Sequence, residues 1–235
     1  KTIAEAWKKA YEADKTSIFG GIVAANREID LETAQMLKPI FLEIVMAPSF
    51  APDALELLCT KKNLRVLKVD MSKDNTVRKQ YVSMNGGMLV QDRDINTKPV
   101  SAEQCVTEAK PTAEQLADLE FAWKIVKHVK SNAIVVAKNG MTYGVGAGQM
   151  NRIGSAEIAL KQAQATLKEE GKDIMTEGLV LASDGFFNDC VALAAEYGIK
   201  AIVQPGGSIR DEDSVKLADE KGITMLFTGE RHFKH

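Results

Sequence analysis

The sequence alternates between two hydrophobic periods, and this alternation constrains the fold more than any other feature. Short apolar runs of strand length are separated by stretches with apolar residues at helical spacing. The pattern predicts helices over residues 3–13, 31–37, 52–58, 112–129, 155–170, 189–197 and 211–221. It predicts a turn and strand over 17–25, and strands over 41–46, 64–69, 88–91, 133–137, 142–145, 179–182, 201–204 and 224–228. Such alternation is typical of an α/β fold in which helices cover mixed sheets.

Residues 71–110 depart from this pattern. They are polar, they contain Asn85-Gly86-Gly87 and Lys98-Pro99, and only residues 88–91 have strand character. We interpret the rest of this stretch as excursions or as a connection between two lobes. A chain of 235 residues is long enough for one large domain or two smaller lobes.

Charge and cysteine content argue against several classes of protein. The net charge of -2 argues against a nucleic-acid binder, which needs a basic face. No apolar run approaches the roughly 20 residues of a membrane span. The scattered Cys59, Cys105 and Cys190 indicate a reducing, cytoplasmic compartment, and the lack of a Cys-x-x-Cys pair argues against structural zinc. No metal site is predicted from the histidines, which are His128, His232 and His235.

Three glycines occupy alternate positions after the start of a predicted strand, at Gly144, Gly146 and Gly148. Their backbone could approach a ligand closely, and the amides of the following helix could meet an anion, with Arg152 adding a charge-assisted bond. The alternative interpretation is a tight strand-to-helix turn that binds nothing. The spacing fits neither the dinucleotide fingerprint nor the P-loop.

Three further positions allow both a functional and a structural interpretation. Asn132 could orient a polar substrate group through its amide donor and acceptor, or it could cap a helix C-terminus. Phe186-Phe187 could form the wall of a site for a flat heterocycle, or it could plug the core. Asp184 could form hydrogen bonds or cap a helix, and we favour the cap.

Several segments share long motifs with a known family. They are Val129-Lys130-Ser131-Asn132-Ala133-Ile134, Gly146-Ala147-Gly148-Gln149-Met150, the run from Gln204 to Asp211, and the ending Arg231-His232-Phe233-Lys234-His235. They closely resemble the formyltransferase part of the bifunctional family that joins AICAR formyltransferase to IMP cyclohydrolase, where AICAR is 5-aminoimidazole-4-carboxamide ribonucleotide. Further similarity over residues 17–24, 44–50 and 85–91 extends the resemblance from end to end.

The resemblance implies a fold and a reaction. It implies lobes of cytidine-deaminase-like topology without zinc, the first over residues 1–110 and the second over 111–235. The reaction would transfer a formyl group from 10-formyltetrahydrofolate to the 5-amino group of AICAR in purine biosynthesis, with no metal required. Members of the family are dimers with composite sites, so we expect a cytoplasmic homodimer that binds these small molecules and neither nucleic acid nor membrane.

The resemblance also implies roles for individual residues. Asn132 would orient the reacting carboxamide and amine, Arg231 would bind the phosphate, and Phe186 would pack on the aminoimidazole. The full set implied for the nucleotide is Phe19, Gly20, Glu43, Gln149, Arg152, Phe186, Arg231 and Phe233. The set implied for the folate is Asp189, Pro205, Gly206, Gly207 and Ser208.

The chain departs from the family pattern in three places. The pattern continues upstream of residue 1 with a Lys-His pair before an Asn-Pro-Cys-Gly run, and that histidine is the family's proton acceptor. The family has Phe-Phe-Pro-Phe-x-Asp where this chain has the shorter Phe186-Phe187-Asn188-Asp189, and it commonly has Ser at the position of Asn151. We therefore expect a fragment that lacks the upstream pair and the cyclohydrolase domain, with little turnover by itself.

Two other functions remain open from the sequence. One is a non-catalytic nucleotide-binding module that keeps the Gly-rich segment and Arg231 but has lost the chemistry. The other is a structural lobe that serves dimer assembly.

Overall fold

The computed structural model describes residues 2–70, 78–95, 98–185 and 190–234. The chain divides into two compact units, Lys1–Arg93 and Asp94–His235. The expected lobe boundary lay between residues 110 and 111, whereas the units divide after Arg93. The intervening segment belongs to the second unit because it pairs with its last strand: Val106 donates its backbone N–H to the carbonyl of Met225 at 2.9 Å.

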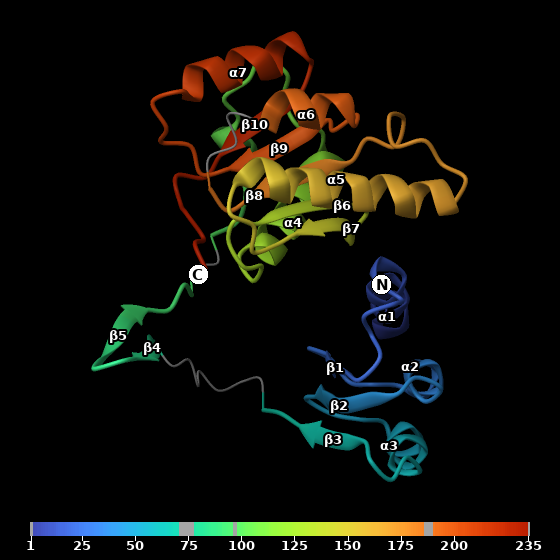
Figure 1. The fold of residues 1–235 in the computed structure, drawn as a ribbon. Helices are drawn as coiled ribbons and strands as arrows, with labels where there is room; N and C mark the ends of the chain where they lie inside the picture. Colours follow the sequence, from blue (N-terminus) through green and yellow to red (C-terminus); the bar gives the residue numbers. More distant parts are fainter. Residues whose placement is uncertain (1, 71–77, 96–97, 186–189, 235) are drawn as a thin grey trace. The chain divides into compact units, whose positions relative to one another are not determined.

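The first unit contains a parallel three-stranded sheet in the order β1-β2-β3, formed by β1 (Gly21–Ala24), β2 (Leu42–Ala47) and β3 (Arg65–Lys68) (Figure 1). The helices are α1 (Ile3–Ala13) before β1, α2 (Leu31–Leu37) between β1 and β2, and α3 (Pro52–Cys59) between β2 and β3. Because strands and helices alternate as predicted, each crossover returns the chain to the same end of the sheet.

Local chemistry sets where these helices begin. Thr2 and Glu5 form a capping box at the start of α1, and Asp30 accepts a hydrogen bond from the backbone N–H of Thr33 at 2.8 Å at the start of α2. Asp30 is therefore the N-cap of α2. Trp7, Leu37 and other apolar side chains of the helices pack on the sheet in one hydrophobic core.

An antiparallel hairpin ends the first unit. It consists of β4 (Lys79–Met84) and β5 (Gly87–Asp92), joined at Asn85-Gly86, where Gly86 has a φ of 79°. The sequence predicted only the second of these strands. Neither strand has a buried face that imposes an alternating pattern, but β5 carries the unbroken apolar run Met88-Leu89-Val90, whereas polar residues interrupt the apolar ones of β4.

The second unit is built on a five-stranded sheet in the order β10-β9-β8-β6-β7. β8 (Val180–Ser183), β9 (Ala201–Gln204) and β10 (Thr224–Phe227) are parallel, whereas β6 (Ile134–Lys138) runs antiparallel to both β8 and β7 (Met141–Gly146). The turn Asn139-Gly140 joins β6 to β7, and both residues have positive φ. A short 3-10 helix, Ala102–Gln104, precedes these elements.

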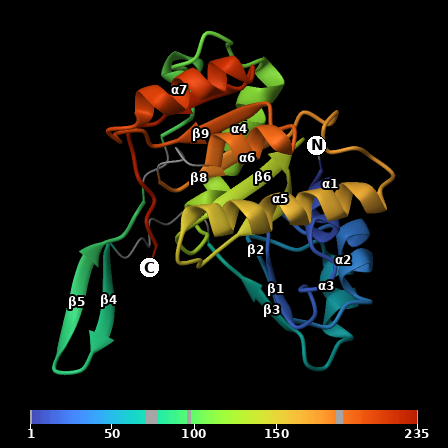
Figure 2. The same cartoon turned by 45° about the horizontal axis from the view of Figure 1, so that its top comes forward.

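Helices cover both faces of this sheet (Figure 2). α4 (Ala113–Val126) packs on the face that carries Val135 and Ala137, and α5 (Arg152–Glu169) packs against β7 on the opposite face. α6 (Val191–Glu196) contacts α5 and α7 (Asp211–Glu220), and α7 packs on β10. The predicted mixed α/β architecture with helix layers is confirmed for this unit.

Several helix ends differ from the predicted ones for identifiable reasons. α4 ends at Val126 rather than 129, and the next residue, Lys127, is its C-cap. α5 begins at Arg152 rather than 155, because the side chain of Asn151 accepts a hydrogen bond from the backbone N–H of Gly154 at 2.8 Å. Asparagine is among the preferred N-cap residues, so Asn151 sets the start of this helix.

Candidate functional site

The sheet of the second unit gathers several predicted segments at one edge. β7, β8, β9 and β10 all end there, and the antiparallel β6 begins there. The loops at this edge are therefore those around Asn132, the residues after Gly146, the residues after Ser183, and the residues after Gln204. Loops at the carboxyl ends of strands are where ligands bind in α/β proteins.

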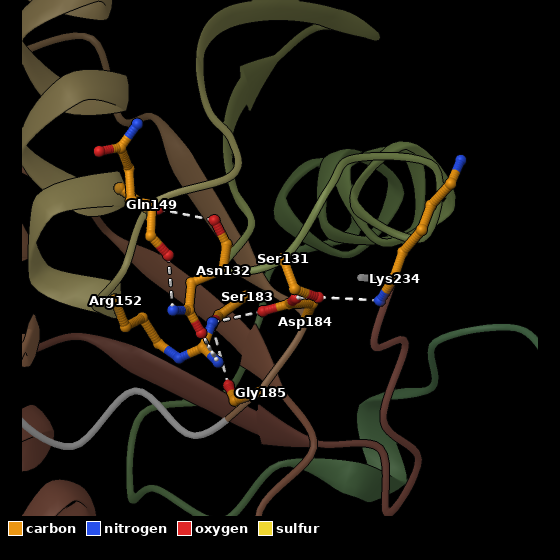
Figure 3. Close-up of polar contacts among 9 residues, drawn as sticks. Ser131, Asn132, Gln149, Arg152, Ser183, Asp184, Gly185 and Lys234 are labelled. Atoms are coloured by element: carbon orange, nitrogen blue, oxygen red, sulfur yellow. Dashed lines mark hydrogen bonds and ion pairs between the residues drawn. The ribbon is translucent and has the colours of Figure 1, made fainter. Parts of the chain in front are cut away.

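A buried carboxylate lies at the centre of this edge (Figure 3). Asp184 is fully buried, and its Oδ2 accepts a hydrogen bond from the Ser131 hydroxyl at 2.5 Å. Its Oδ1 forms an ion pair with the Nη1 atom of Arg152, the first residue of α5. The same Nη1 donates to the Ser183 hydroxyl at 3.3 Å. The predicted capping role of Asp184 is wrong, because its side chain joins two other segments and the N-cap of α6 is Cys190.

Arg152 in turn orients the amide of Asn132. Its Nη2 donates to the Asn132 Oδ1 at 3.0 Å, and the Asn132 Nδ2 donates to the carbonyl oxygen of Gln149 at 2.9 Å (Figure 3). Asn132 is not a helix C-cap, because α4 ends at Val126. The amide is half-buried and fixed at both its oxygen and its nitrogen, which is what an orienting group requires.

The C-terminal segment docks onto this network. Ser131 donates its backbone N–H to the carbonyl of Lys234 at 2.8 Å and accepts the Lys234 N–H on its hydroxyl at 2.9 Å. The backbone N–H of His232 donates to the backbone carbonyl of Asp184 at 3.3 Å. The segment that carries Arg231 and Phe233 is therefore tied to the residues that hold Asn132.

Two glycines show how close Arg231 and Phe233 come to the rest of the edge. A Cβ placed on Gly185 would lie 2.9 Å from the Phe233 ring and 3.0 Å from the Cζ of Arg152. A Cβ placed on Gly207 would lie 3.8 Å from an Nη atom of Arg231, whose guanidinium carbon is 5.9 Å from the centre of the Phe233 ring. Gly185 and Gly207 thus border a group that contains an aromatic ring and two guanidinium groups.

The Gly-rich segment has a structural role at two of its three glycines. Gly144 and Gly146 lie within β7, and a Cβ at either would come within 2.8 Å or less of the carbonyl group of Ala159 or Ser155 in α5. They allow the strand and helix backbones to pack closely. The two interpretations offered by the sequence, a ligand-binding loop and a tight turn that binds nothing, are therefore both wrong for Gly144 and Gly146. Gly148 has a φ of 64°, and its N–H donates to the carbonyl of Lys130 at 2.8 Å.

The residues predicted to border the folate form the loop after β9. Pro205 and Gly206 are buried, and Gly206 packs against Phe227. The backbone N–H groups of Gly207 and Ser208 donate to Oδ2 of Asp211 at 2.6 and 3.1 Å. The loop is therefore shaped by the first residue of α7. Phe186 and Asp189, which were predicted for the nucleotide and the folate, lie outside the described residues.

Three predicted nucleotide residues belong to the first unit. Phe19 is 76% exposed, and its ring centre lies 5.0 Å from that of Phe41. Gly20, with a φ of 72°, donates its N–H to the carbonyl of Phe41 at 2.8 Å. Glu43 lies in β2 rather than in a loop, and its carboxylate pairs with Arg65 at 2.6 Å.

Two histidines have distinct surroundings. His128 follows α4, and its pKa is lowered mainly by burial and then by the nearby positive charge of Lys127. His232 is buried beside Asp94 and Trp123. Within the described ranges, no group of three or more His, Cys, Asp or Glu side chains is placed to hold a metal ion. In the same ranges, no helix is long and apolar enough to cross a membrane.

Sequence reasoning missed the residues that hold the site together. Ser131 and Asp184 were noted in motifs, but their direct contact joins positions 53 residues apart. The one available pointer was Ser183-Asp184 directly after a buried strand, because a carboxylate at such a strand end is rarely left without partners.

The second unit is of a definite kind: an α/β layered structure that presents an oriented amide, guanidinium groups and an aromatic ring at one sheet edge. The comparisons then give its family. The chain belongs to the AICARFT/IMPCHase bienzyme family, whose sequence profile matches residues 1–162.

Individual relatives agree with this assignment. The chain is 59% identical over 237 residues to a "Bifunctional purine biosynthesis protein PurH" of Anoxybacillus flavithermus, and 55% identical over 237 residues to the protein of the same name from Bacillus subtilis. Both alignments cover 100% of this chain, but only 45% and 44% of the relatives, so the chain spans less than half of their length. A solved structure titled "Structural genomics, protein ybgI, unknown function" matches 91% of this chain and 74% of that chain at 11% identity, with a TM-score of 0.22 that supports no inference.

Proposed function

We propose that this chain is part of a purine-biosynthesis enzyme and carries the nucleotide side of an AICAR formyltransferase site. In the proposed reaction the formyl group of 10-formyltetrahydrofolate passes to the 5-amino group of AICAR. The amine nitrogen forms a new bond to the formyl carbon and loses a proton, the bond between that carbon and N10 of the folate breaks, and tetrahydrofolate leaves with a proton on N10. Membership of the AICARFT/IMPCHase bienzyme family supports this reaction class.

The observation that carries the proposal is the fixed amide of Asn132. Its Oδ1 and Nδ2 are each held by a hydrogen bond, from Arg152 and to Gln149 respectively. An amide fixed in this way presents one acceptor and one donor in a constant direction, which matches a carboxamide beside an amine. We assign to Asn132 the orientation of these two groups, and to Arg152 the orientation of Asn132.

The C-terminal segment supplies complementary groups for the rest of the nucleotide. We assign the phosphate to Arg231, because a guanidinium group binds phosphate through paired charge-assisted hydrogen bonds. We assign the face of the heterocycle to Phe233, whose ring lies beside Gly185. Phe19, Gly20, Glu43, Gln149 and Phe186 remain proposed nucleotide residues on the resemblance alone.

The folate assignment rests on the loop after β9 and on the family resemblance. Pro205 and Gly206 are buried at the sheet edge, next to the more exposed Gly207 and Ser208. The N–H groups of Gly207 and Ser208 are already bound to Asp211, so this loop would contribute shape rather than those donors. Asp189 completes the proposed set.

Three wider properties are also proposals. We propose a cytidine-deaminase-like topology without zinc for the lobes, a cytoplasmic location, and a homodimer whose sites lie at the interface. Sedimentation equilibrium of the purified chain tests the dimer directly, because a mass of one chain at all concentrations would contradict it.

Calorimetric titration of AICAR into the purified chain tests the proposed function. Binding is measured rather than turnover, because the assignments made above concern the nucleotide site. We expect Arg231→Ala to weaken AICAR binding by about tenfold or more, as for loss of a charge-assisted hydrogen bond. The matched control is Arg210→Ala, which removes an exposed arginine that pairs with Asp213.

The outcomes separate the alternatives. Binding in the wild type that Arg231→Ala weakens and Arg210→Ala does not would support the nucleotide site. Equal binding by all three proteins would contradict the assignment of Arg231. No binding at millimolar AICAR would contradict a nucleotide site within this chain and favour a structural lobe.

A further inference from the structure

The C-terminal segment turns one residue inward between two that face outward. His232 is 3% exposed, whereas Arg231 and Phe233 are exposed on either side of it. Neighbouring side chains of an extended segment point in opposite directions, so an inward anchor at His232 determines where its two neighbours point. None of the roles assigned above uses His232.

The inward ring has two partners from elsewhere in the second unit. The Nδ1 atom of His232 lies 2.5 Å from Oδ2 of Asp94. The ring centre lies 4.6 Å from that of Trp123, which belongs to α4 and to the hydrophobic core. Because an ionised carboxylate only accepts hydrogen bonds, the Nδ1 atom carries the hydrogen.

The groups around the contact between His232 and Asp94 restrict both side chains. Asp94 also lies 3.7 Å from the ammonium group of Lys127, whose side chain is largely buried. A cavity of about 70 Å³ adjoins the ring and is lined by Lys124, Lys127 and Glu230 among others. A buried polar ring beside so small a cavity has little room to find another partner.

We propose that His232, held by Asp94 and Trp123, is a positioning residue that sets the placement of Arg231 and Phe233 and thereby the affinity for a phosphorylated nucleotide. The inference rests on the proposed function and deepens it. The backbone bonds of the segment to Ser131 and Asp184 fix its path, while the His232 side chain fixes its rotation about that path. Asp94 therefore affects nucleotide binding without touching the nucleotide.

The test compares Asp94→Ala with Asp94→Asn in the 235-residue chain. The alanine variant removes the acceptor, whereas the asparagine variant keeps a carbonyl oxygen that can accept from Nδ1. Lys124→Ala is the matched control, because Lys124 lines the same cavity and pairs with Glu120 on the helix surface. Dissociation constants are measured for AICAR and for the corresponding nucleoside without phosphate.

We expect Asp94→Ala to raise the dissociation constant for AICAR about tenfold, as for loss of a hydrogen bond to a charged group. The preference for nucleotide over nucleoside should fall as well, because only the nucleotide meets Arg231. Asp94→Asn should restore most of this preference, and Lys124→Ala should leave it unchanged. A general loss of stability would weaken the binding of both ligands and would leave the ratio of their dissociation constants unchanged.

Hydrogen exchange of residues 229–234 is the second measurement, and it does not depend on any ligand. Faster exchange in Asp94→Ala than in the wild type supports the anchor, and unchanged exchange overturns it even if AICAR binds. Faster exchange in Asp94→Ala, together with a wild type that shows no preference for AICAR over the nucleoside, would leave the anchor standing but contradict the proposed function. If Asp94→Ala does not fold, His232→Phe keeps a ring in contact with Trp123, removes the Nδ1 hydrogen bond and makes the same comparison.

Discussion

The carboxylate of Asp184 and the guanidinium group of Arg152 form an ion pair that is buried on its acidic side and 16% exposed on its basic side. The pair joins the end of β8 to the start of α5, and it sets the direction in which Arg152 reaches Asn132. The same carboxylate binds the Ser131 hydroxyl. One acidic side chain thus connects three segments that are distant in the sequence.

Replacing Asp184 with alanine should lower the free energy of unfolding by about 3–5 kcal/mol, because it leaves the partly buried Arg152 without its charge partner. Urea unfolding of the purified chain measures this change. Asp213→Ala is the matched control, because Asp213 and Arg210 form a pair in which both side chains are more than half exposed. If Asp184→Ala lowers the free energy of unfolding no more than the control does, the result would contradict the buried network.

Adding a methyl group at Gly146 should disrupt the packing of β7 on α5. The new Cβ would come within 2.6 Å of the carbonyl carbon of Ser155, and neither backbone can move aside easily. We expect Gly146→Ala to lower the free energy of unfolding by about 3 kcal/mol or more, at the upper end of overpacking effects. Gly87→Ala in the exposed hairpin is the control, because a Cβ there meets nothing within 4 Å. Equal thermal midpoints for the two variants would show that the close packing is absent.

The cap at Asp30 predicts a pH dependence of stability. Thr33, whose backbone N–H donates to the Asp30 carboxylate at 2.8 Å, lowers the pKa of Asp30. The cap therefore stabilises the fold fully above the pKa of the unfolded chain, about 3.9, and this contribution is lost as the pH falls through the lower folded pKa. Asp30→Ala should cost about 1 kcal/mol at pH 7.

Asp30→Asn keeps a good capping group that does not titrate in this range, so it is the matched control. The difference in unfolding free energy between wild type and Asp30→Ala should shrink under acid, while that between Asp30→Asn and Asp30→Ala should stay nearly constant. A difference between wild type and Asp30→Ala that grows as the pH falls would reverse the assigned sign and contradict the cap.

Much of the fold could be predicted because its determinants are local. Apolar periodicity located the strands of both sheets, and the predicted helices lie within a few residues of where they occur. β4 escaped prediction because it has neither a buried face nor an unbroken apolar run like that of β5. The division after Arg93 escaped it because the contact of Val106 with Met225 joins distant parts of the chain.

The candidate site was predictable in its members but not in its connections. The motifs identified Asn132, Arg152 and Arg231, and the structure brings them to one sheet edge. The partners of these residues lie far away in the sequence, as Ser131 and Asp184 do, so no local pattern could assign the contacts. Gly144 and Gly146 were misinterpreted for the same reason. Their spacing suggested a ligand, whereas glycine is required there because the backbone of α5 leaves no room for a Cβ atom.

A crystal structure of the chain with AICAR would test the central claim most directly. We predict that the carboxamide lies within hydrogen-bonding distance of the Asn132 amide, that the phosphate contacts the guanidinium group of Arg231, and that the heterocycle packs against Phe233. AICAR bound at the same sheet edge with its phosphate on Arg231 would confirm the account. AICAR bound elsewhere on the chain, with Asn132 and Arg231 not in contact with it, would contradict it.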